Sequence, residues 1–252
     1  MPPSSPPLPL SSSVGRLQVS RVPAKPQYRE LSGKGTEAQQ ADEAWRYELE
    51  RANSVVEDVF GGQLISTLEC SVCHHRSHAF DKILDLSLAI PRRSGGRGIG
   101  HELTVDDCLA EFTASETLDG KNGWVCPVCK KAVSASKKLA IYRPPKVLIV
   151  HLKRFSGSRS LFSKETAFVS ASAALDVSRF CNPAAVGHGG LVYDLYAVSQ
   201  HMGSLSGGHY TSTCRNPDDR EWYHFNDGQV SPARMEEANT AAAYVLFYRR
   251  RA

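Results

Sequence analysis

The sequence predicts an α+β protein whose sheet is mostly antiparallel. Short apolar segments typical of strands fill the second half of the chain, and turn sequences such as NPDD join them. Helix patterns are confined to a few short segments, and the chain contains no internal repeat. With 252 residues and 41% hydrophobic content, the chain is long enough to bury a core.

The first third of the chain changes character twice. Residues 1 to about 43 are rich in Pro, Ser, Gly, Gln and Lys, so we expect a mostly disordered leader. The apolar positions of residues 42–60 predict one or two short helices around Asn53. An alternating segment at 61–70 and an apolar segment at 80–90 then predict two strands, one on each side of a cysteine pair.

The remaining elements are expected in the following order. A Gly- and Arg-rich loop at 92–100 precedes a helix at 104–112, which Thr104 caps. The apolar segment KVLIVHLKRF predicts a central buried strand, whose start is fixed by the preceding RPP. Ser231 followed by Pro232 predicts the start of a short helix. Four more strands are expected, at 193–200, 209–215, 221–226 and 244–249.

Composition excludes several classes of protein. Thirty basic and 26 acidic residues give a net charge of +4, too weak for nucleic acid to be the expected partner. No run approaches the roughly 18 apolar residues of a membrane helix, so no membrane partner is expected. The N-terminus lacks the features of a signal peptide, which favours a cytoplasmic or nuclear location.

Four of the seven cysteines form two Cys-x-x-Cys pairs: Cys70 with Cys73, and Cys126 with Cys129. Each pair offers two thiolates from one tight turn, and two pairs complete a closed tetrahedral site, which predicts a structural zinc ion. Two alternatives stay open: free thiols without metal, and a nucleic-acid-binding zinc ribbon that uses the Arg/Gly loop. Three nearby histidines are expected to lie outside the ligand set: His74, His75 and His78.

One histidine has the surroundings of a proton-transfer group. His209 follows Gly207 and Gly208, which leave room for another backbone to pass closely. Asn226 ends a later aromatic strand, and an amide that accepts from a ring N–H fixes the tautomer of a catalytic histidine. A structural role is the alternative, and it is the expected role of His151 and His224.

Several motifs resemble the ubiquitin-specific protease family of deubiquitinating cysteine proteases. They run from about Asn53 to Tyr248 in the family's order: FGGQLISTLECSVC, FDKILDLSLAI, WVCPVCKKAVSASKKLAIYRPP, PPKVLIVHLKRF, GGHYTSTC, WYHFNDGQV and AYVLFY. The resemblance implies a papain-like palm that carries a histidine and fingers tipped by zinc knuckles. Residues 44–251 would form a partial catalytic domain, with fingers at about 60–145 and palm at about 146–251.

The resemblance also implies roles for single residues. By motif position His209 resembles the general base, Asn226 its orienting partner and Asp227 an acidic residue that supports the site. The two cysteine pairs match the family's zinc ligands. Three residues would bind the tail of ubiquitin: Gly207, Gly208 and His201.

The family's nucleophile box, Gly-x-x-Asn-x-Gly-Asn-Thr-Cys, does not occur in these 252 residues, and nothing resembling the thumb precedes Asn53. The remaining cysteines are expected to be non-catalytic: Cys108, Cys181 and Cys214. The expected function is thiol-dependent hydrolysis of isopeptide or ester bonds at the C-terminal glycine of ubiquitin. This chain would supply the His/Asn half of the site and the fingers that grip ubiquitin, and would be inactive by itself. The alternative is a catalytically inactive, zinc-containing ubiquitin-binding module, and ubiquitin or ubiquitinated proteins are the implied partners.

Overall fold

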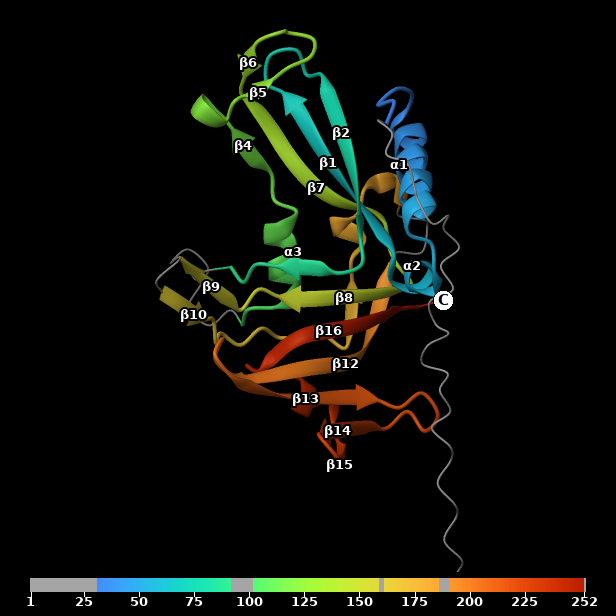
Figure 1. The fold of residues 1–252 in the computed structure, drawn as a ribbon, viewed down its shortest axis with the longest axis vertical. Coiled ribbons are helices and arrows are strands. Elements are labelled where there is room, and N and C mark those ends of the chain that lie inside the picture. The colour runs from blue at the N-terminus through green and yellow to red at the C-terminus, as the bar shows by residue number, and fades with distance from the viewer. Residues whose placement is uncertain (1–30, 92–101, 159–160, 186–190, 252) are drawn as a thin grey trace, which may run out of the picture.

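The computed structural model describes residues 31–91, 102–158, 161–185 and 191–251 (Figure 1). Most of the predicted leader and the Arg/Gly loop at 92–100 lie outside these residues. Two mostly antiparallel sheets dominate the described part, which confirms the predicted α+β class. None of the described helices is long and apolar enough to span a membrane.

The larger sheet has eight strands in the order β15-β14-β13-β12-β16-β8-β3, and β11 pairs with β12 off this path. Among its described pairs, β3 and β8 are parallel and the others are antiparallel. Its strands are β3 (Leu86–Leu88), β8 (Val147–Leu152), β11 (Ala174–Asp176), β12 (Val192–Gly203), β13 (Gly208–Arg215), β14 (Trp222–Asn226), β15 (Gln229–Ala233) and β16 (Ala243–Arg250).

The smaller sheet has four strands in the order β2-β1-β7-β4 and extends away from the larger sheet, as Figure 1 shows. A two-stranded β5–β6 ladder lies at its far end. The strands of this region are β1 (Gly62–Cys70), β2 (Arg76–Ile83), β4 (Glu116–Leu118), β5 (Trp124–Val125), β6 (Ala132–Val133) and β7 (Ala135–Arg143). A separate hairpin consists of β9 (Phe155–Ser158) and β10 (Leu161–Lys164).

The one or two short helices expected around Asn53 are two: α1 (Glu37–Arg51) has 15 residues, and α2 (Val55–Phe60) follows after Asn53. However, α1 begins at Glu37, inside the segment predicted as a disordered leader. Thr36 and Gln39 form a capping box there, and Ala41 is buried against Ile65 of β1. The predicted leader is therefore too long at its C-terminal end, because the helix cap at Thr36 and the burial of Ala41 were not recognised in the sequence.

Two other boundaries differ from the prediction. The strand expected at 80–90 is divided between the two sheets, because β2 ends at Ile83 and β3 pairs with β8. Ser231 and Pro232 lie in β15 rather than at a helix start, since β15 pairs with β14 as a hairpin. Proline is tolerated there because β15 is the edge strand. The short helix α4 (Met235–Ala238) begins only after this strand.

The main core lies between the larger sheet and the elements that cover it. The helix α3 (Val105–Phe112), capped by Thr104 as predicted, buries Val105, Cys108 and Leu109 in this core. Strand β8 buries alternate residues, so its side chains reach the core from one face. Other fully buried core side chains are Leu86, Leu88, Leu148, Leu152, Leu175, Tyr193, Leu246 and Tyr248.

Candidate active site and metal centre

His209 and Asn226 lie together at one end of the larger sheet. His209 is the second residue of β13 and Asn226 is the last residue of β14, the neighbouring strand. The Nε2 atom of His209 lies 2.6 Å from Oδ1 of Asn226, and the His209 side chain is exposed. Because an amide oxygen only accepts, this hydrogen bond assigns the ring proton to Nε2. The Nδ1 atom is then left as a proton acceptor.

Asp227 occupies the turn that follows Asn226. With Gly228 it connects β14 to β15, and its φ of 51° lies in the left-handed region, which Asp tolerates better than most residues. The side chain is exposed, and its carboxylate has no hydrogen-bond partner among the described residues. Asp227 therefore shapes the turn that ends the Asn226 strand, and among the described residues no hydrogen bond joins its carboxylate to His209.

Gly208 is required by the packing of this chain itself. A Cβ atom at Gly208 would overlap the ring of His201 and would lie 2.6 Å from the carbonyl oxygen of Met202. A Cβ atom at Gly207 would meet no atom within 4 Å. The two glycines thus differ: Gly208 gives room to a buried side chain of the neighbouring strand, whereas Gly207 faces open space.

His201 lies on strand β12 rather than in a loop, and only 3% of its surface is exposed. Its ring packs against Phe155, Tyr210 and Tyr244. Burial, with a smaller contribution from the charge of Lys164, lowers the pKa of His201, so the neutral form is favoured. Its Nδ1 atom has no hydrogen-bond partner among the described residues. The ring of this histidine packs against Gly208, the residue that precedes His209.

Three cysteines lie outside the paired motifs, and none has the surroundings of an activated thiol. Burial raises the pKa of Cys108 to about 11 and that of Cys181 to about 12, and it also raises the pKa of Cys214. Cys214 is five residues beyond His209 on β13, about 17 Å along the strand and on the opposite face. The raised pKa values favour the protonated thiol at all three cysteines.

The histidines predicted to be structural have other partners. His151 hydrogen bonds through Nδ1 with Ser87 at 3.0 Å, and its ring packs edge-on against Tyr244. His224 hydrogen bonds through Nδ1 with Thr213 at 3.0 Å.

A fully buried arginine was not expected from the sequence. Arg154, in the HLKRF motif, is completely buried and donates to the carbonyl oxygens of Glu165, Ala167 and Ala243. These bonds connect the end of β8 to the start of β16. In the sequence, its signal is its place two residues after the apolar strand.

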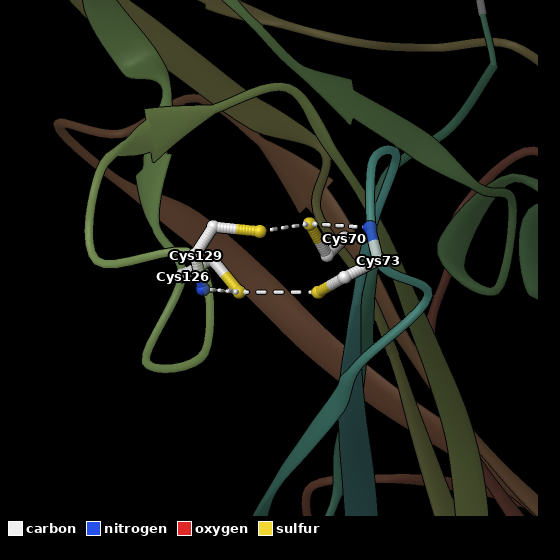
Figure 2. Close-up of side chains that lie close together, drawn as sticks. All are labelled: Cys70, Cys73, Cys126 and Cys129. Atoms are coloured by element: carbon white, nitrogen blue, oxygen red, sulfur yellow. Dashed lines mark hydrogen bonds between the residues drawn. The ribbon is translucent and has the colours of Figure 1, made fainter.

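The two Cys-x-x-Cys pairs meet at the far end of the smaller sheet (Figure 2). The four Sγ atoms lie within 4.8 Å of one another; those of Cys70 and Cys129 are 3.8 Å apart, and those of Cys73 and Cys126 are 3.6 Å apart. Tetrahedral zinc with Zn–S bonds of about 2.3 Å requires Sγ atoms about 3.8 Å apart. The cluster therefore fits a structural zinc site with four thiolate ligands.

Backbone amides donate hydrogen bonds to two of the four sulfurs, those of Cys70 and Cys126. The N–H groups of Val72 and Cys73 donate to Sγ of Cys70 at 3.4 Å, and the N–H group of Cys129 donates to Sγ of Cys126 at the same distance. The bond from Cys73, with that from Val72, lowers the pKa of Cys70 to about 6, whereas the neighbouring thiols, Cys73 first, raise the pKa of Cys129 to about 12. The neighbouring histidines contact other residues: His74 faces Glu69, His75 stacks on Trp124, and His78 hydrogen bonds with Thr67.

The two knuckles repeat the same backbone geometry. The N–H group of His74 donates to the carbonyl of Cys70 at 3.0 Å, and that of Lys130 donates to the carbonyl of Cys126 at 2.8 Å. His74 and Lys130 have φ values of 57° and 58°, in the left-handed region. Both turns therefore hold a non-glycine residue in a strained conformation.

Comparison with known proteins gives a consistent result. The family model described as "Ubiquitin carboxyl-terminal hydrolase" matches residues 18–248. The protein named ubiquitin carboxyl-terminal hydrolase 2 from Gallus gallus is 44% identical over 209 residues, which are 81% of this chain and 55% of that protein. Its Homo sapiens counterpart is 43% identical over 205 residues, which are 81% of this chain and 33% of that protein. The chain thus spans about half, or less, of the length of these relatives.

Solved structures agree with the sequence comparisons. A SAGA DUB module that contains Ubp8 and is bound to monoubiquitin matches with a TM-score of 0.69 and 29% identity, covering 85% of this chain and 46% of that chain. The same module bound to ubiquitin aldehyde matches with a TM-score of 0.69 and 26% identity, covering 85% of this chain and 47% of that one. The extent of the family match, together with the four-cysteine cluster, shows that this chain belongs to the ubiquitin carboxyl-terminal hydrolase family and covers part of its catalytic domain.

Proposed function

We propose that this chain supplies the histidine and asparagine of a cysteine-type deubiquitinase, together with the fingers that grip ubiquitin. The reaction is hydrolysis of isopeptide or ester bonds at the C-terminal glycine of ubiquitin. The observation that carries this proposal is the exposed His209 whose Nε2 atom lies 2.6 Å from Oδ1 of Asn226. The structural match to a ubiquitin-bound relative supports the same substrate.

In the proposed mechanism, a cysteine from outside these residues loses its proton to Nδ1 of His209 and attacks the carbonyl carbon of ubiquitin's terminal glycine. His209 then returns the proton to the leaving amine, and it later activates the water that hydrolyses the thioester. Asn226 keeps the ring in the required tautomer. Asp227 contributes its negative charge to the same end of the sheet without a direct hydrogen bond.

The substrate tail would pass beside the start of β13. Gly207 leaves open space there, and Gly208 allows the ring of His201 to support the backbone. We assign the fingers to about 60–145 and the palm to about 146–251, with the exception of β3, which pairs in the larger sheet. Four reduced thiolates suit a reducing compartment, the cytoplasm or the nucleus.

This chain alone is proposed to be inactive, because the raised pKa values of its three unpaired cysteines favour the thiol form. The same observation favours a second candidate function, in which the chain is a zinc-containing, ubiquitin-binding module without turnover. The two functions differ in whether a nucleophilic cysteine joins His209.

The experiment combines two measurements on the purified chain. A fluorogenic ubiquitin amide should show no turnover, and titration with ¹⁵N-labelled ubiquitin should perturb the resonances of its C-terminal tail. As a matched control, His209→Ala should retain this binding, since the proposed role of the ring is proton transfer. Thiol-dependent turnover would refute the proposal that the three unpaired cysteines are non-catalytic. Ubiquitin resonances that do not change on titration would refute the proposed binding of ubiquitin.

A further inference from the structure

A groove of about 260 Å³ lies at the other end of the larger sheet, where β12 begins and β13 and β16 end. Four arginines line it, accompanied by a single carboxylate among the described residues: Arg215, Arg220, Arg249, Arg250 and Asp194. Arg215 is six residues beyond His209 on β13, about 20 Å along the strand. The groove is therefore separate from the His209 end of the sheet, and its role does not depend on the proposed function.

The single carboxylate in the groove offsets only part of the arginines' charge, because it interacts with Arg215 and also pairs with Arg251. Arg251 binds both oxygens of Asp194 at 2.6 to 3.0 Å, so that this acid already has a partner of opposite charge. The hydrogen bonds from Arg251 lower the pKa of Asp194, which therefore stays ionised in this pair. The acidic residues of the adjacent turn do not line the groove: Asp218, Asp219 and Glu221.

The arginines are oriented by the fold but keep donors free. Arg215 donates through Nε to the carbonyl of Arg220 at 2.9 Å, and Arg250 donates through Nη1 to the carbonyl of Pro144 at 3.3 Å. Arg249 lies over the ring of Tyr196, 5.3 Å from its centroid. Each guanidinium has five N–H donors, so most of them are available to a ligand.

The turn that carries Arg220 is strained. Arg220 has a φ of 64°, a conformation in which glycine or asparagine is much more favourable than arginine. Its carbonyl orients Arg215, and its own side chain lines the groove. Strained residues of this kind concentrate at binding sites, where the side chain has a use that offsets the cost.

The chemistry of the groove selects its ligand. Arginine forks pair bidentately with carboxylates, and clusters of them recognise acidic peptide motifs. The volume is below the roughly 300 Å³ at which pockets for drug-sized molecules begin, so side chains rather than a whole small molecule fit it. Binding of single-stranded nucleic acid requires free aromatic faces, but Arg249 covers the half-buried ring of Tyr196.

We propose that this groove binds a segment of a partner protein rich in aspartate and glutamate, whose carboxylates pair with the four arginines. The docked partner would lie at the end of the sheet opposite His209.

The test measures the fluorescence anisotropy of a labelled octaglutamate peptide, with an octaglutamine peptide as the uncharged control. The wild-type chain should bind octaglutamate but not octaglutamine. The double substitution Arg215→Gln/Arg249→Gln should weaken binding at least about tenfold, because two bidentate pairs are lost. The matched double variant Arg46→Gln/Lys121→Gln removes the same charge from exposed sites outside the groove and should change affinity less than about twofold.

A third variant separates binding from folding. Arg220→Gly removes one groove arginine and relieves the left-handed strain, so it should fold at least as stably as wild type and still bind the peptide more weakly. Equal losses in the groove and control double variants would overturn the proposal. Tighter binding of a single-stranded RNA of the same charge would overturn it as well.

Discussion

The substitutions Gly208→Ala and Gly207→Ala should have opposite effects on stability, although the two glycines are adjacent. At Gly208 the new methyl group would overlap the buried ring of His201 and lie 2.6 Å from the Met202 carbonyl. That carbonyl cannot easily retreat, because Met202 pairs with His209 across β12 and β13. Overpacking of this kind costs about 1–3 kcal/mol, so Tm should fall by about 2–4 °C for each kcal/mol.

At Gly207 the methyl group would meet open space, so this variant is the matched control. Its free energy of unfolding should be unchanged or higher by up to about 1 kcal/mol, since alanine reduces the entropy of the unfolded chain. Urea denaturation of both variants measures the difference. If ubiquitin's tail passes Gly207, this variant should also bind ubiquitin more weakly. Equal destabilisation by both substitutions would refute the packing argument for Gly208.

The remaining predictions concern the cysteines and the knuckles. Cys126→Ser should abolish stoichiometric zinc, measured by mass spectrometry, and unfold the fingers, because zinc-thiolate sites contribute about 10 kcal/mol or more; full zinc retention would contradict the four-thiolate assignment. Lys130→Gly and His74→Gly should each raise the free energy of unfolding by about 1 kcal/mol, measured with zinc bound, and a decrease would argue against the left-handed strain. Stability should fall as pH rises from about 9 to about 11, because folded Cys108 keeps its proton while the unfolded thiol loses it. Cys108→Ala should show a shallower fall over that range.

The sequence predicted those features that depend on local spacing. The two Cys-x-x-Cys pairs gave the metal cluster, and the strand patterns gave the α+β class together with most strands of the larger sheet. Thr104 was recognised as a helix cap from its neighbours alone. In each case the signal is a short local pattern, and the metal cluster needs two copies of one such pattern.

Features that depend on tertiary pairing were missed. Pro232 lies in the β14–β15 hairpin rather than at a helix start. Both places tolerate proline, so the residue type alone could not distinguish them. The position of His201 depends on β12 continuing to Gly203 and on Gly208 of the next strand making room. The arginine groove brings together residues from three strands that are distant in sequence. The residue pattern of one segment cannot predict that side chains from several strands lie together.

The tautomer of the neutral His209 ring, measured by ¹⁵N NMR of its imidazole nitrogens at mildly alkaline pH, tests the central claim most directly. The hydrogen bond to Asn226 predicts that the neutral ring carries its proton on Nε2 and leaves Nδ1 free to accept. Asn226→Ala should remove this preference and give a mixture of tautomers. A proton on Nδ1, or a tautomer ratio that Asn226→Ala leaves unchanged, would contradict the claim that this chain carries an oriented general base.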